Sequence, residues 1–456
     1  MNLSGMTHRE RKASLCLASI FAMRMLGLFM VLPVLAIYGT ELIGATPALI
    51  GLAIGAYGFT QACLQIPFGM WSDRLGRKPV IIIGLLLFIA GSVLAAMAND
   101  IYQVIFGRCL QGAGAIASTI MAMAADLTRE EQRTKAMAMI GISIGLAFCL
   151  AMVLGPLVTD IYGLSGLFYL TAALSVVALA LVWILPTPIE QKRHREANTV
   201  LGQIGQVLRN GSLLRLDIGV FALHFVLMGA FVVVPVILEE QAGLSRHQHW
   251  WVYLITLVLS FIAMVPFIIV GEAKRKMKEI KLGAIVLLAM AVILLYFNQQ
   301  SVIGLVVSLF AFFMAFNWLE ASLPSLVSKI APAGSRGTAM GVFSTSQFLG
   351  AAIGASSSGW VYQTWGMLGL TLLAVSILVL WWVASVTMQQ PPYLNSIMLD
   401  LTQVNKMSSP ADLSNTLAAV RGVEDVVVIP EEQAAYLKVD KKALDTQALQ
   451  AYGFGV

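Results

Sequence analysis

Twelve long apolar runs recur along this chain, and no other feature constrains its fold as strongly. A bilayer core about 30 Å thick requires about 20 apolar residues in helical form. Each of the twelve runs meets or approaches that length. We therefore predict twelve membrane-spanning helices, at 14–38, 47–71, 79–98, 101–127, 134–159, 166–186, 212–238, 248–271, 280–297, 302–328, 338–362 and 366–388.

The composition agrees with an all-α membrane protein and not with a soluble one. Hydrophobic residues make up 58% of the chain and charged residues only 12%, whereas soluble domains carry about 25% charged residues. The net charge of +5 does not indicate a nucleic-acid partner, because the basic residues lie in short loops between apolar runs. The ten-residue alternating units of a membrane β-barrel are absent from the sequence.

Lysine and arginine are distributed one-sidedly among the loops, which predicts the topology. Positive residues concentrate in cytoplasmic loops of membrane proteins. One set of alternate loops carries almost all of them: Arg9, Arg11 and Lys12; Arg74, Arg77 and Lys78; Arg129, Arg133 and Lys135; Lys192, Arg193 and Arg195; Lys274, Arg275, Lys276 and Lys278; Lys329 and Arg336. The opposite loops hold only Arg246. We expect a multi-pass protein of a bacterial inner membrane with both termini in the cytoplasm.

The runs divide into two groups of six around one long connection. We predict an N-terminal six-helix bundle over 1–186, a cytoplasmic linker over 187–211 and a C-terminal six-helix bundle over 212–390. The linker carries a basic run and then an amphipathic stretch at 200–208, which is typical of a helix lying on the membrane face. A solvated connector attracted to anionic lipid explains the basic run equally well.

Hydropathy falls after the last apolar run, and residues 391–456 are predicted to form a soluble cytoplasmic domain. Strands are expected at 396–401, 423–429 and 434–439, and helices at 410–420 and 440–452. The order β-α-β-β-α indicates a small α+β ferredoxin-like sandwich without its last strand.

The loop between the second and third spans carries the most specific motif. It reads Gly69-Met70-Trp71-Ser72-Asp73-Arg74-Leu75-Gly76-Arg77-Lys78. Its glycines allow a tight turn and close backbone approach. Asp73 can interact with the positive N-terminal end of another helix, and Arg77 can pair with a carboxylate on a neighbouring span. The alternative, that the basic residues only set topology, leaves Asp73 and both glycines unexplained.

This loop resembles motif A of the major facilitator superfamily, and the resemblance covers all twelve spans. It implies a secondary transporter with two pseudo-symmetric six-helix bundles that work by alternating access. It further implies that Asp73 meets the start of span 11 near Gly337-Thr338 and that Arg77 pairs with Asp126. The resemblance implies that these charges close the cytoplasmic side when the transporter faces outward. We call the implied group the motif-A latch, and its members are Gly69, Asp73, Arg74, Gly76, Arg77, Lys78, Asp126 and Arg133.

The fourth span contains an arginine about 10 Å from its outer end. Burying Arg108 there costs at least about 2.5 kcal/mol, so this side chain is expected to face a cavity or a partner. The stretch from Ile105 to Gly114 resembles motif B of proton-coupled members, whose arginine is linked to proton transfer. Gly112 permits close helix packing. A purely structural hydrogen-bonding role for Arg108 is the alternative.

The fifth span ends on a pattern that resembles the antiporter motif of drug exporters. Gly155-Pro156 match that motif and supply a helix kink, whereas Ala151 and Thr159-Asp160 depart from it. These departures leave export less supported than the transporter class.

Other polar residues inside the apolar runs are candidates for function, because such residues are rare in spans. Arg24 lies in span 1, His224 in span 7, and Asn317 and Glu320 in span 10. His224 and Glu320 can carry a proton, and with Arg24 and Arg108 they are the proton-coupling candidates. Asn317 is a candidate for the substrate cavity. Structural roles for His224 and Asn317 stay open.

The soluble tail resembles the domain found in YajR-type transporters, a group within the superfamily. Its segment 419–426 is similar to heavy-metal-associated domains, but the equivalent of their Cys-x-x-Cys, at 405–409, contains no cysteine. We expect no metal site and no cofactor, and the ligand or partner of this domain stays unknown.

Three functions are compatible with these features. The first is a proton-coupled antiporter that exports small amphipathic molecules, with the bilayer, a small-molecule substrate and protons as partners. The second is a metabolite importer, and the third is a non-transporting sensor with a ligand-binding tail. The sequence holds no nucleotide-binding loop for an ATP-driven pump and no nucleophile–base pattern of an enzyme.

Overall fold

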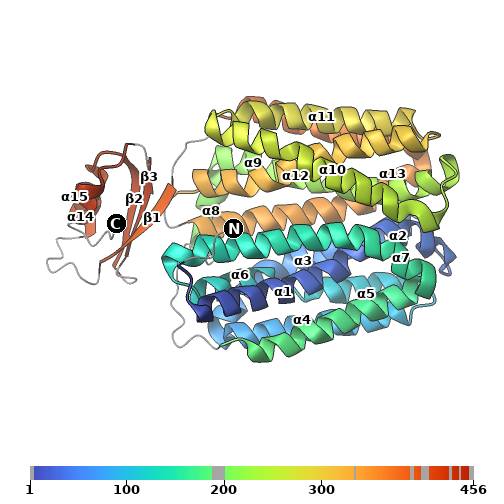
Figure 1. Ribbon diagram of the computed structural model, residues 1–456, viewed down its shortest axis with the longest axis horizontal. Coiled ribbons are helices and arrows are strands. Elements are labelled where there is room, and N and C mark those ends of the chain that lie inside the picture. The colour runs from blue at the N-terminus through green and yellow to red at the C-terminus, as the bar shows by residue number, and fades with distance from the viewer. Residues whose placement is uncertain are drawn as a thin grey trace.

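The structure is a computed structural model that describes residues 5–186, 201–332, 335–390, 395–401, 410–430, 434–440 and 443–450. Figure 1 shows an elongated helical bundle with a small sheet-containing domain at one end. We call the end beside this domain the domain end, and the opposite end the far end. Residues 187–200 of the predicted linker over 187–211, and the Cys-x-x-Cys equivalent at 405–409, lie outside the described residues.

The N-terminal half runs back and forth between the two ends. Polar caps start several of its helices: Thr7 accepts from Glu10 N, Thr46 from Leu49 N and Asp100 from Gln103 N. The elements are α1 His8–Met30, α2 Leu32–Tyr38, η1 Gly39–Glu41, α3 Pro47–Leu75, α4 Arg77–Ala96, α5 Ile101–Ala113, α6 Ala117–Asp126 and α7 Glu130–Ile184.

The C-terminal half follows the amphipathic helix α8 Leu201–Arg209, which takes the place of the stretch predicted at 200–208. Asn210 caps the next helix, because its side chain accepts from Ser212 N and Leu213 N. The remaining elements of this half are α9 Gly211–Val236, the π-helical turn η2 Ile237–Gln241, η3 Arg246–Gln248, α10 His249–Ala273, α11 Met277–Phe297, α12 Val302–Ile330 and α13 Arg336–Val386.

Ten helices among the described residues are long and apolar enough to cross a membrane, but α7 reverses within its length. Gly163 has φ of 69° and ψ of −179°. Ser143 Oγ donates to Ala18 O, and Cys16 Sγ donates to Leu181 O. The residues at 143 and 181 therefore reach the same level of α1, although a straight helix would separate them by about 57 Å.

The long helix α13 reverses in the same way at Gly366, where φ is 62° and ψ is −158°. Gly350 lies against the Phe221 carbonyl and Gly219 lies against the Trp381 indole, so both parts of α13 pack on one level of α9. With two helices folded back, ten apolar helices give twelve crossings. The all-α fold with twelve spans is confirmed.

One span is broken where an unbroken helix is expected. The predicted span 101–127 consists of α5 and α6, separated by residues 114–116. Gly114 has φ of −74° and ψ of 53°, which is not helical. A Cβ at Gly114 would lie 2.2 Å from Gly84 O, so only glycine allows α4 to approach this closely.

The soluble domain has a three-stranded antiparallel sheet of order β1-β3-β2. Its strands are β1 Asn395–Asp400, β2 Val423–Ile429 and β3 Ala434–Val439, and its helices are α14 Pro410–Ala418 and α15 Thr446–Gln450. Leucines from the sheet and both helices form one core, including Leu399, Leu417, Leu437 and Leu449. The α+β ferredoxin-like order is confirmed.

The second helix of this domain begins later than the sequence predicts. Asp440 and Asp445 lie outside this helix, because Asp440 N donates to Gly422 O and Asp445 N donates to Arg421 O. The Asp445 side chain then caps α15 by accepting from Gln447 N and Ala448 N. The predicted start of the 440–452 helix is therefore wrong among the described residues.

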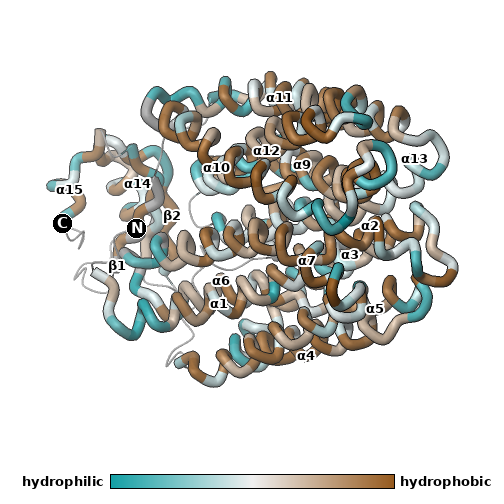
Figure 2. Tube along the Cα trace, turned by 45° about the vertical axis from the view of Figure 1, so that its right-hand side comes forward, coloured by the Kyte–Doolittle hydropathy of each residue, from teal (hydrophilic) through white to brown (hydrophobic). Residues whose placement is uncertain are grey.

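The outer surface of the bundle suits a lipid environment. Figure 2 shows hydrophobic residues along the lengths of the helices and hydrophilic residues gathered mainly at their ends. The large apolar side chains of Trp183, Phe297 and Ile303 are 78%, 75% and 77% exposed. Such exposure is unfavourable in water and expected against acyl chains.

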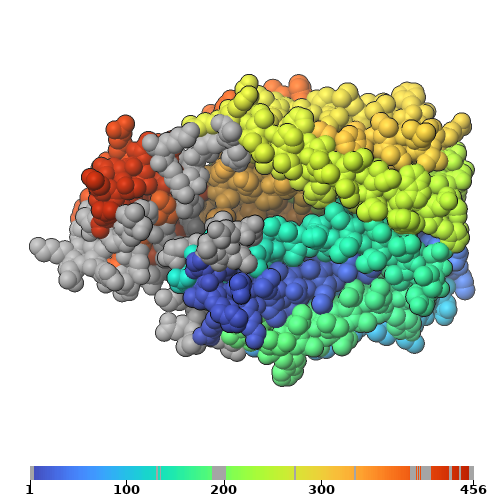
Figure 3. Space-filling model, viewed as in Figure 1, coloured from blue at the N-terminus to red at the C-terminus, as the bar shows by residue number. Residues whose placement is uncertain are grey.

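The two halves contact one another mainly from mid-bundle to the far end. Gly51 and Gly55 of α3 lie directly against the backbone of α13 at Ala355 and Ala352. Phe148 of the first half packs on Phe231 of the second, with ring centroids 6.4 Å apart. Figure 3 shows a hollow between α7 and α10 toward the domain end.

Candidate functional site

The motif-A loop forms a buried charge cluster at the domain end. Arg77, at the start of α4, donates from Nε to Asp126 Oδ2 at 2.9 Å. Its Nη1 donates to Ser72 Oγ at 2.7 Å and also contacts Asp73 Oδ1. The side chains of Arg77 and Asp126 are each 3% exposed. One guanidinium thus joins α3, α4 and α6.

Local backbone geometry explains why glycine precedes Arg77 in this cluster. Gly76 has φ of 96°, a left-handed conformation that side chains disfavour, and it lies between α3 and α4. The chain can therefore turn sharply and place Arg77 as the first residue of α4. Gly69 lies one turn before Ser72, whose Oγ donates to Gly69 O at 2.6 Å.

The other members of the motif-A latch lie around this core. Arg74 is exposed and Lys78 is partly exposed. Arg133, early in α7, lies within electrostatic range of Asp126. Asp73 is 23% exposed and pairs with Arg77, while Thr338 at the start of α13 donates to Gln203 of α8 at 3.1 Å. The described contacts of Asp73 thus stay within its own half.

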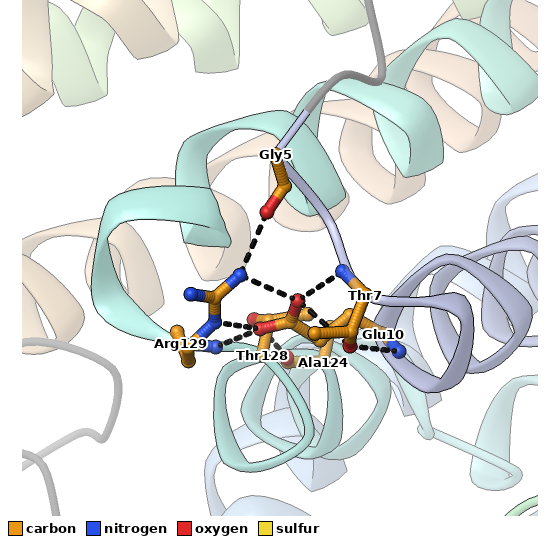
Figure 4. Close-up of polar contacts among 6 residues, drawn as sticks. All are labelled: Gly5, Thr7, Glu10, Ala124, Thr128 and Arg129. Atoms are coloured by element: carbon orange, nitrogen blue, oxygen red, sulfur yellow. Dashed lines mark hydrogen bonds and ion pairs between the residues drawn. The ribbon is translucent and has the colours of Figure 1, made fainter.

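A second ionic contact, which sequence reasoning missed, holds the turn beyond Asp126. Glu10 of α1 accepts from the backbone N, Nε and Nη2 of Arg129, and also from Thr7 N (Figure 4). Arg129 Nη2 donates to Gly5 O as well. Glu10 is only 5% exposed. The contact fixes the start of α1 against the α6–α7 turn. It could not be predicted from local sequence patterns, because its two residues are 119 positions apart.

Two buried arginines occupy the middle of the N-terminal half. Arg24 is 0% exposed, and its Nη2 donates to Gln61 Oε1 and to Gly114 O, both at 2.8 Å. The carbonyl at Gly114 is freed by the break between α5 and α6. The Arg24 guanidinium also lies 5.8 Å from the ring centre of Tyr57.

Arg108 contacts the same tyrosine. Its guanidinium is 5.0 Å from the Tyr57 ring centre, and its Nη1 donates to Gln111 Oε1 at 2.8 Å. Within the described part of the chain, Arg24 and Arg108 bind neutral groups and aromatic rings.

Two glycines allow close packing of helices in this half. Gly112 allows α5 to approach α3, because a Cβ there would lie 2.2 Å from Tyr57 O. Gly155 similarly packs on Met30 O, beside Pro156 inside α7.

Titratable groups meet in the C-terminal half. His224 of α9 lies with its Nε2 3.7 Å from Glu320 Oε2 of α12. Gln347 of α13 lies between them, with Nε2 2.8 Å from His224 Nε2 and 3.3 Å from Glu320 Oε1. The His224 side chain is 9% exposed and that of Glu320 is 38% exposed. A buried imidazole thus supports a carboxylate that solvent can reach.

Asn317 lies one helical turn from Glu320 but is occupied by another contact. Its Nδ2 donates to Ser260 Oγ of α10 at 3.0 Å, and it is 6% exposed. This contact joins α12 to α10. Gln347 was missed in the sequence because a neutral amide on a small-residue helix carries no charge signal, although its place between two titratable groups makes it part of the site.

No cluster of three or more histidine, cysteine or acidic residues suited to a metal ion occurs among the described residues. The four cysteines are free thiols, and Cys63 is exposed while the other three are partly buried. The described groups at these positions are ionic and hydrogen-bonding side chains.

Comparisons with known proteins agree with this architecture. Residues 17–355 match the Major Facilitator Superfamily, and residues 404–449 match the YajR YAM domain. The "Inner membrane transport protein YajR" of Escherichia coli (strain K12) is 46% identical over 443 residues, which is 97% of each chain. The "Multidrug resistance protein MdtH" of Enterobacter sp. (strain 638) is 23% identical, over 78% of this chain and 90% of its own.

Solved structures share the fold at low sequence identity. A mutant form of the nucleoside transporter NupG aligns with a TM-score of 0.67 and 17% identity, over 82% of this chain and 99% of its own. A D-xylose-proton symporter aligns with a TM-score of 0.66 and 15% identity, over 83% of this chain and 98% of its own.

Proposed function

We propose that this chain, which belongs to the Major Facilitator Superfamily, is a secondary transporter that exports small amphipathic molecules in exchange for protons. Transport is the function that the family and its relatives share. Proton coupling, the direction of transport and the substrate class are our inference. They rest on the side chains in the middle of the bundle.

The observation that carries the proposal is the Glu320–His224 pair. A partly exposed carboxylate 3.7 Å from a buried imidazole, with Gln347 joining α9, α12 and α13, is an unusual group to place inside a membrane. Carboxyl and imidazole groups can each hold or release a proton. A proton added to this group changes its net charge and its pattern of donors and acceptors.

Proton binding at Glu320 changes which arrangement of the halves is favoured. Ionised Glu320 accepts from Gln347, whereas the protonated acid has one oxygen that donates. A proton that binds one conformation more tightly than the other shifts the population between them. Substrate binding in the same cavity, with the opposite preference, then couples the two movements.

The motif-A latch has a complementary role in this proposal. Asp73 pairs with Arg77 while the far end is closed, and it meets the start of α13 once the halves rock to close the domain end. Arg77 keeps its bond to Asp126 in both states. The shared guanidinium thus allows Asp73 to change partners without leaving an isolated buried charge.

Export is favoured by two observations of unequal weight. Gly155-Pro156 retains the core of the antiporter pattern and packs on α1. The more distant relative MdtH is named a multidrug resistance protein. Accumulation of substrate inside right-side-out vesicles would contradict export and would favour the alternative function, import of a metabolite.

In the proposed orientation, the domain end lies on the cytoplasmic side of the inner membrane. The described loops rich in lysine and arginine, at 74–78, 129–135 and 274–278, lie at this end, and the charge rule assigns such loops to the cytoplasm. The same proposal assigns 1–186 and 212–390 to the two bundles, 187–211 to a cytoplasmic linker and 391–456 to the soluble domain. Reporter fusions at Gly76 and at Gly243 are expected to lie on opposite sides of the membrane, and the same side for both would overturn it.

The experiment that tests the function uses proteoliposomes containing the full-length protein and an internal pH indicator. Addition of a lipophilic dye such as ethidium is expected to drive protons across the membrane in the direction opposite to the dye. Arg108→Ala is expected to abolish the proton movement. Dye flux that ignores an imposed pH gradient would contradict proton coupling, and no flux of any compound in a toxic-compound panel would favour the sensor.

A further inference from the structure

The short loop element η3 links the two halves at the far end. Arg246 Nη1 donates to Glu41 Oε1 at 3.1 Å, and Glu41 belongs to η1 of the N-terminal half. The Nε of the same guanidinium donates to Glu239 Oε1 at 2.9 Å, within its own half. One cation therefore bridges carboxylates of both halves. It is also the single basic residue that the predicted outer loops contain.

Two further contacts cross the same boundary. The Arg246 guanidinium lies 4.8 Å from the ring centre of Tyr38, at the end of α2. His247 Nδ1 contacts Asp160 Oδ1, near the reversal of α7. The second half thus touches the first at two separate places, α2–η1 and α7, through adjacent residues of one loop.

The loop that presents these side chains is fixed to the C-terminal half. Leu244 N donates to Leu238 O at 2.8 Å, and His249 Nε2 lies 3.1 Å from Leu244 O. Gln248 N donates to Ser245 O at 2.8 Å. Because this backbone is held to its own half, rotation of the halves would carry Arg246 and His247 away from Glu41 and Asp160 together.

The neighbouring packing shows that this end is closed. Gly359 of α13 lies against Pro47 O of α3, and Ala48 N donates to Gln363 Oε1 at 3.1 Å. Close backbone packing of this kind cannot be retained when the halves separate. The ionic contacts differ, because Glu41 is 67% exposed and water can replace its partner at little cost.

We propose that Arg246 helps to hold the far end closed during the transport cycle. It is the centre of a clasp, by which we mean the ionic contacts between the two halves made by Glu41, Asp160, Arg246 and His247. The clasp lies at the end opposite the motif-A latch, and opening of the outer side requires it to break. The inference rests on the proposed alternating access, but not on proton coupling or on the direction of transport.

Distances between labels test the clasp without any substrate. Spin labels are attached at Tyr162→Cys and Phe297→Cys, two exposed far-end positions on opposite halves, after Cys16, Cys63, Cys109 and Cys149 are replaced by serine or alanine. Arg246→Gln and Glu41→Gln are each expected to raise the ratio of long to short label distances about two- to fivefold.

Three controls make this result specific to the clasp. Glu240→Gln alters a neighbouring exposed carboxylate outside the clasp and is expected to leave the distances unchanged. The double variant of Arg246 and Glu41 is expected to match Arg246→Gln alone, because the contact of Glu41 with the other half runs through Arg246. The midpoint of thermal unfolding in detergent is expected to stay close to that of the parent for each variant, because the contact is exposed.

Unchanged distances in both single variants would overturn the clasp, and so would fully additive effects in the double variant. These measurements use neither a dye nor a pH gradient. A transporter with intact dye–proton exchange but unaltered distances would reject the clasp alone, whereas shifted distances without proton exchange would retain the clasp and reject the proposed coupling.

Discussion

Arg77 Nε lies 2.9 Å from Asp126 Oδ2, and this pair joins the start of α4 to the end of α6 with both side chains almost fully buried. Two charges removed from water to this degree are stabilising only while they stay together. The same guanidinium also serves Ser72 and Asp73. The pair therefore sets the geometry of the whole domain-end cluster.

Asp126→Asn is expected to destabilise the protein by about 3 kcal/mol, because it leaves Arg77 buried with a weaker partner. Asp73→Asn is expected to cost less than about 1 kcal/mol, since Asp126 remains and Asp73 is partly exposed. Thermal unfolding in detergent measures both losses of stability. Arg74→Gln, a change at an exposed neighbouring residue, is the control. Equal losses for the two aspartates would contradict the assigned geometry.

Glu10→Gln is expected to lower stability by about 1 to 2 kcal/mol, because the neutral amide cannot accept from every Arg129 donor that the carboxylate serves. The loss stays modest because the Arg129 side chain is 56% exposed. Arg11→Gln, a neighbouring exposed change, is the control in the same thermal assay. A loss no larger than that of the control would exclude a stabilising role for this contact.

Gly112→Ala is expected to cost about 1 to 3 kcal/mol, since its Cβ would lie 2.2 Å from a backbone oxygen of α3. The displacement would also move Arg108, one turn earlier on the same helix, so transport should fall as well. Gly145→Ala is a matched control, because nothing lies within 4 Å of its added Cβ. A neutral Gly112→Ala would show that α3 and α5 are not packed as described.

His224→Asn is expected to slow proton-driven transport about tenfold, because it removes the imidazole that faces Glu320 and Gln347. The lost hydrogen bond with the neutral Gln347 is worth up to about 1.5 kcal/mol, which corresponds to that factor. The pH profile of transport should also change, whereas His8→Asn, an exposed change near the N-terminus, should leave it intact. An unchanged profile for His224→Asn would place that residue outside the coupling group.

The sequence predicts the spans well because lipid imposes a simple requirement on every helix that crosses it. The reversals at Gly163 and Gly366 fall at or beside the boundaries between predicted spans, and the ends of β2 and β3 agree with prediction. The break at Gly114 was not predicted, since it depends on close approach of Gly84 from another helix. Local patterns do not contain that contact.

Prediction of the site divides along a similar line. The Arg77–Asp126 pair was expected from the resemblance of the loop at 69–78 to a family motif. The partners of the buried charges were not expected, because Gln61, Gln111 and Gln347 are neutral and bind arginine or histidine only in the folded chain. Charged residues inside apolar runs can be recognised in a sequence, whereas the amides that hydrogen-bond to them can be identified only from the packing of the helices.

The most direct test of proton coupling at Glu320 is the Glu320→Gln variant in proteoliposomes, and Glu240→Gln, at an exposed carboxylate away from the membrane centre, is its control. A side chain that cannot gain or lose a proton should still allow dye exchange between equal concentrations, but it should abolish dye accumulation driven by a pH gradient. We predict this separation for Glu320→Gln and normal accumulation for the control. Full pH-driven accumulation by Glu320→Gln would contradict the proposed mechanism.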